Sequence, residues 1–283
     1  MQTLAEIKDL LNSRGLRPKR SLGQNFLADQ NLILKLVRAC EVGQGDRVLE
    51  VGPGTGTLTE ALLDTGAQVV SCELDDALAD LLRDRLGERE NFTLVHGDCL
   101  YKRILSLDVA NRLGQEQFKL AANLPYGCAS PLLSDLLLHW PQCTMMVVTV
   151  QKELVDRLLA RPRTREYGPI SVVAQAACTA ERIANMPPEC FWPRPKVESA
   201  MVRLVRRDKP LCDLQALAAA CSALFRQRRK RIAQPLKELL GDATPPEGVS
   251  PDMRAEEVSL EAFCRLADQV AAMRAASDAM REP

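Results

Sequence analysis

The four residues Asn123-Leu124-Pro125-Tyr126 have the types and order needed to alkylate an exocyclic amine. Such an amine is a poor nucleophile because its lone pair is delocalised into the ring. The Asn123 side-chain oxygen can accept one N–H and the Leu124 carbonyl the other, which draws the nitrogen toward tetrahedral geometry. The Tyr126 ring offers a face on which a flipped base can stack. The alternative is a strand-ending turn with a tyrosine in the core.

A glycine-rich segment, Gly52-Pro53-Gly54-Thr55-Gly56, lies between an apolar run and a helical pattern. A glycine loop in this position lets a ligand approach the backbone closely. Its spacing differs from the G-x-G-x-x-G of dinucleotide sites, and Glu50 directly precedes it. The Glu50 carboxylate would repel a pyrophosphate but attract a cofactor that carries an ammonium and a sulfonium. The segment therefore favours S-adenosylmethionine over NAD.

Two further acids stand at the ends of predicted strands. Glu73 lies about 20 residues after the glycines, where an acid can bridge two ribose hydroxyls. Asp98 follows the next strand, and its carboxylate can accept a hydrogen bond from the amino group of a cofactor adenine. Each acid alone is also compatible with an ordinary helix N-cap. Three acids at consecutive strand ends, with Glu50 as the first, are harder to explain in that way.

The elements that must position these residues alternate between strand and helix. Helical patterns cover Asp29–Cys40, with Asp29 as N-cap, Leu58–Thr65 and Lys152–Ala160. The alternation predicts an α/β fold with a mainly parallel, doubly wound sheet. Seven strands are expected: Arg47–Val51, Gln68–Asp75, Phe92–Gly97, Phe118–Ala122, Met145–Val150, Ser171–Cys178 and Ser199–Val205.

The composition changes at Arg206–Pro210, and the pattern beyond it is helical. Helices are expected over Leu214–Phe225, around Leu236–Leu240 and over Leu260–Ala275, with a Pro/Gly-rich connector at Gly241–Pro251. We therefore expect two domains, residues 1–208 and a small all-helical domain of residues 209–283.

Basic residues are concentrated in three places. Lys+Arg and Asp+Glu both number 37, so net charge gives no argument for an acidic partner, which local patches must supply. Five cations within Arg226–Arg231, with no acid among them, favour nucleic acid. The other two places are a basic connector near residue 17 and a stiff, proline-rich aromatic loop after Phe191, although both also fit solvated or structural connections. The expected RNA-binding residues are Arg17, Lys19, Arg20, Arg194, Lys196, Arg226, Arg228, Arg229, Lys230 and Arg231.

The remaining composition narrows the class of protein. The chain has 283 residues and is 46% hydrophobic, so it can bury a large core. Its ten cysteines show no C-x-x-C spacing, and there are only two histidines, which argues against a zinc site and for a reducing compartment. No signal peptide or membrane-spanning run is apparent. We expect a cytoplasmic monomer without a metal.

Several segments, taken in order, resemble the ribosomal RNA adenine dimethyltransferase family from about residue 17 to about residue 270. Within that family the resemblance is strongest to members that act on small-subunit rRNA. The segments are Gln24-Asn25-Phe26-Leu27, Glu50–Gly56, Glu73-Leu74-Asp75, Gly97-Asp98, Asn123–Tyr126, Phe191-x-Pro193-x-Pro195-Lys196-Val197-x-Ser199 and Gln227–Lys230.

The resemblance implies a Rossmann-like class I methyltransferase domain followed by a helical rRNA-binding domain. It also implies S-adenosylmethionine as donor, N6,N6-dimethylation of two adjacent adenosines near the 3′ end of small-subunit rRNA, and a role in small-subunit biogenesis. The implied cofactor-binding residues are Asn25, Leu27, Gly52, Gly54, Glu73, Leu74, Asp98 and Asn123. The implied catalytic residues are Asn123, Leu124, Pro125, Tyr126 and Phe191, with Phe191 on the other side of the target base.

The sequence departs from the family pattern at two points. Family members commonly continue the tetrad with Asn-Ile-Ser or Asn-Ile-Thr, whereas this chain has Gly127-Cys128-Ala129-Ser130. Pro235 falls where the family has an uninterrupted helix, so we expect the helix to stop and restart there.

Direct methyl transfer, without a covalent enzyme intermediate, is the expected chemistry. The alternatives are a dimethyltransferase of large-subunit rRNA and an rRNA-binding assembly factor that needs no catalysis. Leu124 and the helical domain favour the small subunit. A DNA adenine methyltransferase is disfavoured because the sequence shows no separate target-recognition domain.

Overall fold

The chain packs as two units in a computed structural model that describes residues 1–279. The first unit comprises Met1–Val155 and Glu181–Val205, and the second comprises Asp156–Ala180 and the chain from Arg206 onward. This division differs from the expected boundary at residue 208, because residues 156–180 belong to the second unit. The physical reason is packing: α8 (Pro169–Ala177) lies against α9 (Leu214–Phe225) and α11 (Leu260–Ala279).

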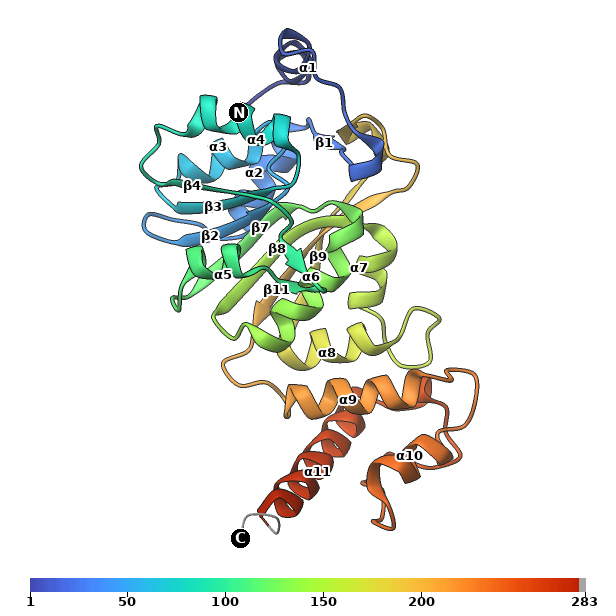
Figure 1. Cartoon of the computed structure of the whole chain (residues 1–283). Coiled ribbons are helices and arrows are strands. Elements are labelled where there is room, and N and C mark those ends of the chain that lie inside the picture. Colours follow the sequence, from blue (N-terminus) through green and yellow to red (C-terminus); the bar gives the residue numbers. More distant parts are fainter. Residues whose placement is uncertain (280–283) are drawn as a thin grey trace. The chain divides into compact units, whose positions relative to one another are not determined.

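The first unit is built on a seven-stranded sheet in the order β4-β3-β2-β7-β8-β11-β9 (Figure 1). Parallel pairing joins β4 to β3, β3 to β2, β2 to β7 and β7 to β8, whereas β11 runs antiparallel to β8. The mainly parallel seven-stranded sheet is therefore confirmed. The strands are β2 (Arg47–Val51), β3 (Gln68–Glu73), β4 (Phe92–His96), β7 (Phe118–Asn123), β8 (Cys143–Gln151), β9 (Cys178–Met186) and β11 (Ser199–Arg206).

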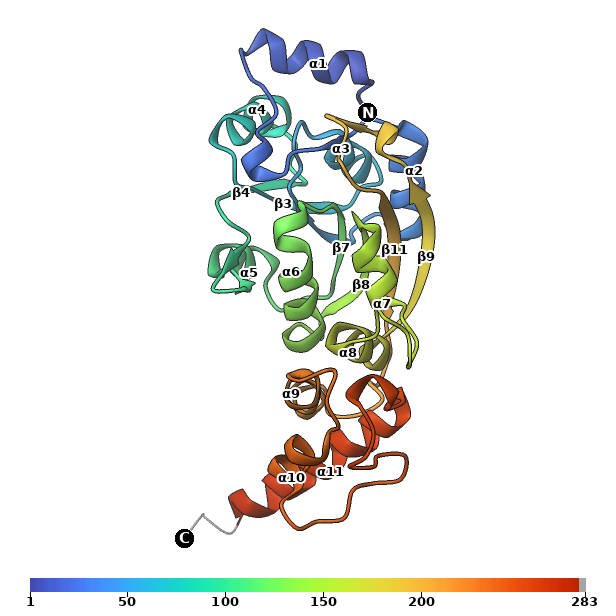
Figure 2. The same ribbon diagram turned by 90° about the vertical axis from the view of Figure 1, so that its right-hand side faces the viewer.

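Helices cover both faces of this sheet (Figures 1 and 2). On one face lie α2 (Gln30–Ala39), α3 (Thr57–Leu63) and α4 (Asp76–Leu86), and on the other lie α5 (Leu107–Leu113) and α6 (Tyr126–His139). Asp29 caps α2 as expected, because its carboxylate accepts the N–H groups of Asn31 and Leu32 at 2.9 and 3.2 Å. The sheet is thus doubly wound.

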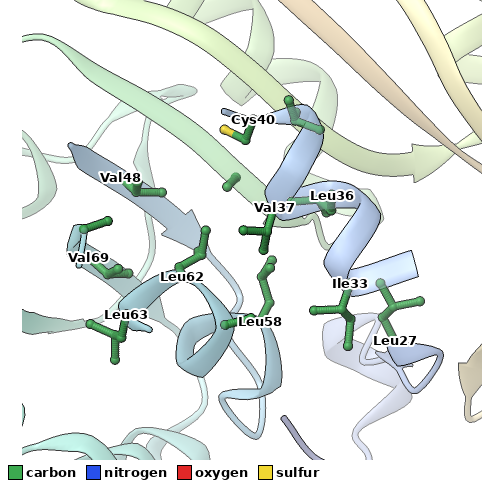
Figure 3. Packing of buried hydrophobic residues seen from close by; sticks show 14 of the residues in the cluster. Leu27, Ile33, Leu36, Val37, Cys40, Val48, Leu58, Leu62, Leu63 and Val69 are labelled. Atoms are coloured by element: carbon green, nitrogen blue, oxygen red, sulfur yellow. The ribbon is translucent and has the colours of Figure 1, made fainter. Parts of the chain in front are cut away.

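The core beneath α2 and α3 fixes the strand ends in place (Figure 3). Leu36 of α2 and Leu62 of α3 are fully buried against Val48 of β2 and Val69 of β3. Burying an aliphatic side chain of this size stabilises a fold by about 1.5–3 kcal/mol. Apolar packing of this kind holds β2 and β3, and hence the loops that follow them, in a fixed register.

Shorter elements surround the sheet edge. The first unit begins with α1 (Leu4–Ser13), whose N-cap Thr3 forms a reciprocal capping box with Glu6. Two small sheets follow: β1 (Phe26–Leu27) pairs with β10 (Phe191–Trp192), and β5 (Leu100–Tyr101) pairs with β6 (Ile104–Leu105). Pairing of β1 with β10 brings two distant motifs of the sequence side by side.

The second unit is helical, and α7 (Lys152–Leu158) leads into it from the sheet. The predicted strand over Ser171–Cys178 is wrong: these residues form most of α8, and β9 starts only at Cys178. The adjacent Val172 and Val173 imitate a buried strand. The overlooked signals were Pro169 at the first helical position and the Ser171 hydroxyl, which accepts the Gly168 N–H at 3.0 Å.

The basic run Arg226–Arg231 lies between two helices and not on one. Helix α9 ends at Phe225 and α10 spans Ala233–Leu240, so the helix does stop and restart, but the break precedes Pro235. Pro235 sits in the first turn of α10, where backbone N–H groups have no intrahelical partner and proline costs no hydrogen bond.

Within residues 1–279, no helix is long and apolar enough to cross a membrane.

Candidate active site

A cavity of about 530 Å³ opens where β4, β3, β2 and β7 end. Because these four strands are parallel neighbours, their carboxyl ends meet at one edge of the sheet, the usual ligand position in such folds. The expected site residues that line this cavity are Asn25, Leu27, Gly52, Gly54, Glu73, Leu74, Asp98, Asn123, Leu124, Pro125 and Tyr126. Residues from five separate stretches of sequence are thereby brought together.

The glycines of the loop after β2 are required by their surroundings. Gly52 and Gly54 have φ angles of 72° and 61°, which side chains adopt only with strain. A Cβ atom at Gly52 would lie 2.9 Å from the Pro125 ring, and one at Gly54 would lie 2.9 Å from the Phe26 ring. The loop therefore packs directly against the Asn123–Tyr126 tetrad and the Gln24–Leu27 segment, here called the Asn25 motif.

The Glu73 carboxylate lies at the end of β3 and orients the glycine loop. Its oxygens accept the Gly54 N–H at 3.1 Å and the Asp75 N–H at 2.9 Å. Burial raises the pKa of Glu73, while these backbone hydrogen bonds oppose that shift. A buried carboxylate facing the cavity is suited to accept hydroxyl groups from a ligand.

Glu50, the last acid before the glycines, also lines the cavity and is fully buried. The hydroxyls of Thr59 and Ser71 both donate to it at 2.7 Å. Burial raises its pKa to about 7, with a smaller contribution from the charge of nearby Glu73. Cationic groups placed in this cavity would favour the ionised form of Glu50.

Asp98 and Leu74 border the same cavity from neighbouring strand ends. Asp98 is exposed, and its Oδ1 accepts the Leu100 N–H at 2.9 Å, which orients the carboxylate. Leu74 is a half-exposed apolar residue directly after Glu73. An apolar surface beside an oriented acceptor suits a flat heterocycle with an amino group.

Asn123 ends β7 with a fixed side-chain orientation. Its Nδ2 donates to the Asn25 carbonyl at 2.9 Å, so Oδ1 is the remaining acceptor of the amide. Asn25 in turn donates from its own amide to the Gly23 carbonyl at 2.9 Å. The Asn25 motif, almost 100 residues earlier, therefore sets the direction of the tetrad asparagine.

The other tetrad residues complete the turn from β7 into α6. Leu124 is buried, and its N–H donates to the Thr149 carbonyl at 3.1 Å, which extends the pairing with β8. Pro125 ends the strand as expected and is the residue before α6. The Tyr126 hydroxyl lies 2.9 Å from the buried Ser199 hydroxyl, and burial raises the pKa of Tyr126.

Phe191 is the one expected catalytic residue that does not line the cavity. It lies in β10 opposite Leu27 of β1, and its side chain is buried in the core cluster. The motif that begins with Phe191 reaches the site through its last residue instead, since Ser199 contacts Tyr126.

The expected RNA-binding residues are mostly exposed but differ in their partners. In the first unit, Arg20 lines the cavity and Arg17 and Lys196 are exposed, while Lys19 pairs with Asp75 at 2.8 Å and Arg194 with Glu189 at 2.9 Å. In the second unit, Arg228 pairs with Glu256 at 2.7 Å and donates to the Thr164 carbonyl, and Arg231 pairs with Asp252. Arg226, Arg229 and Lys230 are exposed.

Two supporting residues were missed from the sequence. Gln24 receives the Lys19 N–H at 2.7 Å and donates to Asp75 at 3.0 Å, which ties the basic connector to the end of β3. Gln2 is buried and donates to the Thr55 carbonyl at 3.0 Å, so the N-terminus braces the glycine loop. Gln24 opens the Gln24–Leu27 segment but had no role assigned to it, and Gln2 belongs to no motif, so neither contact could be found from spacing. Among residues 1–279, no group of three or more His, Cys, Asp or Glu side chains is placed to hold a metal ion.

The family model for ribosomal RNA adenine dimethylase matches residues 15–272. The chain belongs to this family. It is 39% identical over 280 residues to the ribosomal RNA small subunit methyltransferase A of Phenylobacterium zucineum, covering 98% of this chain and 96% of the relative. It is 35% identical to the protein of that name from Clostridium botulinum, covering 92% and 97%.

Two solved structures have folds similar to that of this dimethylase. The 23S rRNA methyltransferase ErmE matches with a TM-score of 0.65 at 28% identity, over 87% of this chain and 100% of that one. A dimethyladenosine transferase from Plasmodium falciparum matches with a TM-score of 0.69 at 23% identity, over 85% and 95%. The dimethylase is thus an S-adenosylmethionine-dependent rRNA adenine N6,N6-dimethyltransferase with a Rossmann-like fold.

Proposed function

We propose that this dimethylase modifies N6 of two adjacent adenosines near the 3′ end of small-subunit rRNA, in the cytoplasm, acting as a monomer on the immature small subunit. The observation that carries the proposal is the convergence of Asn123, Glu73 and Asp98, from the ends of β7, β3 and β4, on one cavity. The choice of the small subunit is supported by relatives at 35–39% identity, against 28% for the 23S rRNA enzyme.

The cavity has the donor set that S-adenosylmethionine needs. Glu73 accepts the ribose hydroxyls, Asp98 accepts the adenine amino group, and Leu74 packs on the adenine. Glu50, with Asn25, Leu27, Gly52, Gly54 and Asn123, surrounds the cationic methionine end. These assignments rest on the buried carboxylates and the cavity lining described above. When bound, the cofactor supplies an electrophilic methyl group.

The tetrad holds and orients the target amine. Asn123 Oδ1 accepts one N6–H, because its Nδ2 is already engaged by the Asn25 carbonyl. The Leu124 carbonyl accepts the second N–H, and both acceptors stabilise the positive charge that develops on nitrogen. The Tyr126 ring, anchored through its hydroxyl by Ser199, stacks on the flipped base. Phe191, buried in the core, contributes to catalysis by supporting β1 and Leu27.

The rRNA contacts are assigned to the basic patches of both units. In the first unit, the proposed contacts to rRNA are made by Arg17, Lys19, Arg20, Arg194 and Lys196. In the helical part, residues 209–283, the proposed contacts are made by Arg226, Arg229 and Lys230, because these side chains are exposed and lie in a turn. Arg228 is partly buried against Glu256 and so supports the turn, whereas the exposed Arg231 can exchange Asp252 for a phosphate.

Labelled methyl transfer tests this proposal. The protein is incubated with methyl-labelled cofactor and either small or large ribosomal subunits that lack the modification, and the labelled nucleotides are mapped. We expect N6,N6-dimethyladenosine at two adjacent positions near the 3′ end of small-subunit rRNA. Label confined to large subunits would support the 23S-type alternative, and the absence of any transfer would leave only an assembly role.

A further inference from the structure

The β5–β6 hairpin, rooted beside the cavity, exposes an unusual set of side chains. Tyr101 is 64% exposed, Ile104 51% and Leu107, at the start of α5, 78%. The only charged residues between 99 and 107 are Lys102 and Arg103, which form the hairpin tip. Within residues 1–279, neither cation forms a salt bridge with a carboxylate.

The hairpin turn holds both cations in an unfavourable backbone conformation. Lys102 and Arg103 have φ angles of 49° and 73°, as both central residues of a type I′ turn must. Such turns favour Asn and Gly, because other side chains are strained at positive φ. Two cations therefore occupy positions where local backbone preference alone would favour other residues.

The hairpin is also held rigidly at its base. Asp98 accepts the Leu100 N–H, and the buried Asp135 of α6 accepts the Leu105 N–H, both at 2.9 Å. Asp135 lies 2.8 Å from His139 Nδ1 and accepts the Trp140 indole N–H at 3.1 Å, which fixes the carboxylate. Since α6 begins at Tyr126, the hairpin is braced against the helix that carries the tetrad.

We propose that this hairpin is an rRNA-contacting element, in which Tyr101 stacks on an unpaired base and Lys102 and Arg103 contact phosphates. This inference rests on the proposed function and adds a surface next to the same cavity, which Leu100 of β5 lines. The Lys102 ammonium already lies 5.3 Å from the Tyr101 ring centroid, so the cation and the stacking face form one surface. Aromatic faces flanked by cations are typical of single-stranded RNA binding.

A protein partner fits this surface less well. Lysine is depleted at protein–protein interfaces, whereas arginine and aromatic residues are enriched there, so Lys102 is the residue that argues against a protein partner. Two adjacent cations lie at the hairpin tip, and residues 99–107 contain no acid. This surface is complementary in charge to a phosphate backbone, which carries regularly spaced negative charge.

The test uses the full chain and two probes: protein-free small-subunit rRNA, and small subunits that lack the modification. The variant Lys102→Asn with Arg103→Gly removes both cations but supplies residues that the turn prefers, so the hairpin should persist. Tyr101→Ser removes the stacking face, and Tyr101→Phe is its matched control. Affinity is measured for each probe at salt concentrations from about 50 to about 200 mM, a range over which phosphate contacts make binding strongly salt-dependent.

We expect the double variant to bind both probes more weakly, with the slope of log K against log salt reduced by roughly 0.7–0.9 per cation. Tyr101→Ser should lose roughly 5- to 100-fold in affinity without a change of slope, and Tyr101→Phe should bind like the wild type. Cofactor affinity and melting temperature should not fall in any variant.

Equal affinities and slopes for the wild type and the double variant would overturn the inference. Weaker binding to intact subunits alone, with rRNA binding unchanged, would overturn it in favour of a ribosomal-protein contact. Failure of the wild type to label small-subunit rRNA would instead sink the proposed function, and the binding measurements judge the hairpin independently of that result.

Discussion

Two buried carboxylates, Glu50 and Glu73, set the electrostatics of the cavity. Both face the same space, and burial raises the pKa of each above its ordinary value. Their desolvation disfavours the charged forms in the empty protein, whereas a cationic ligand favours them. The two residues differ in their neighbours: hydroxyl groups bind Glu50, and backbone N–H groups of the loop bind Glu73.

Replacing Glu73 should weaken the cofactor markedly. Each charge-assisted hydrogen bond to a ribose hydroxyl is worth roughly 1.5–3 kcal/mol, so Glu73→Gln should bind S-adenosylmethionine at least about tenfold more weakly in calorimetry. Glu73→Gln keeps one acceptor oxygen for the two N–H groups of Gly54 and Asp75, so its melting temperature should fall less than that of Glu73→Ala, which leaves both N–H groups unpaired. Unchanged cofactor affinity in both variants would remove Glu73 from the site.

Replacing Glu50 should change how stability depends on pH. The pKa of Glu50 is about 7 in the folded protein against an ordinary 4.5, so between these values the folded state retains a proton that the unfolded state has lost. This contribution to the free energy of unfolding therefore falls as pH rises from about 4.5 to 7, and is constant outside that window. Glu50→Gln has no such group.

Melting temperatures of the apo protein across this pH range measure the effect. We expect the melting temperature of Glu50→Gln to rise relative to the wild type as pH increases through the window. Glu88→Gln, at an exposed glutamate, serves as control. Parallel curves for wild type and Glu50→Gln would show that Glu50 does not titrate as described.

At the scale of elements, the strand ends were predictable and one helix was not. The glycines after Arg47–Val51 and Pro125 after Phe118–Asn123 mark the ends of these strands in the sequence. Site residues lie at or directly after these ends. The run Ser171–Cys178 is mostly apolar, and Val172 and Val173 favour a strand, whereas Pro169 at the helix start and packing against α9 and α11 favour the helix. The contact between Tyr126 and Ser199 joins residues 73 positions apart, a distance that no local pattern encodes.

The turn between α9 and α10 contains both cations paired with acids and exposed cations that we propose bind RNA. Arg228 is tied to Glu256 and the Thr164 carbonyl, so Arg228→Gln should lower stability by about 1 kcal/mol with a small effect on the salt slope. Arg229 and Lys230 are exposed, so replacing both with Gln should leave the melting temperature unchanged and reduce the rRNA salt slope by roughly 0.7–0.9 per cation.

Thermal melts and salt-dependent rRNA binding of these two variants form a matched pair. Cofactor affinity should be unaffected in both, since the cavity is lined by the first unit alone. If the Arg229/Lys230 variant keeps the wild-type salt slope, the turn does not contact phosphate.

At the scale of the whole molecule, a chain of zero net charge must concentrate its cations to bind rRNA. The proposed rRNA contacts lie in patches of different kinds: the exposed turn of the helical unit, the connector near Arg20 at the cavity, and the β5–β6 hairpin. Long-range attraction is correspondingly small, so specificity depends on local contacts and on the shape of the cavity. Binding and chemistry are therefore separable by mutation.

The proposed role of Asn123 in methyl transfer is tested most directly by single-turnover methylation of unmodified small subunits by the Asn123→Ala variant. In the proposed mechanism Asn123 Oδ1 engages the amine mainly in the transition state, so at saturating cofactor the variant should bind rRNA like the wild type. Its rate of adenosine N6 methylation should fall on the order of 100-fold or more, as for loss of one preorganised polar group at a reacting centre. A near-wild-type single-turnover rate would contradict the account.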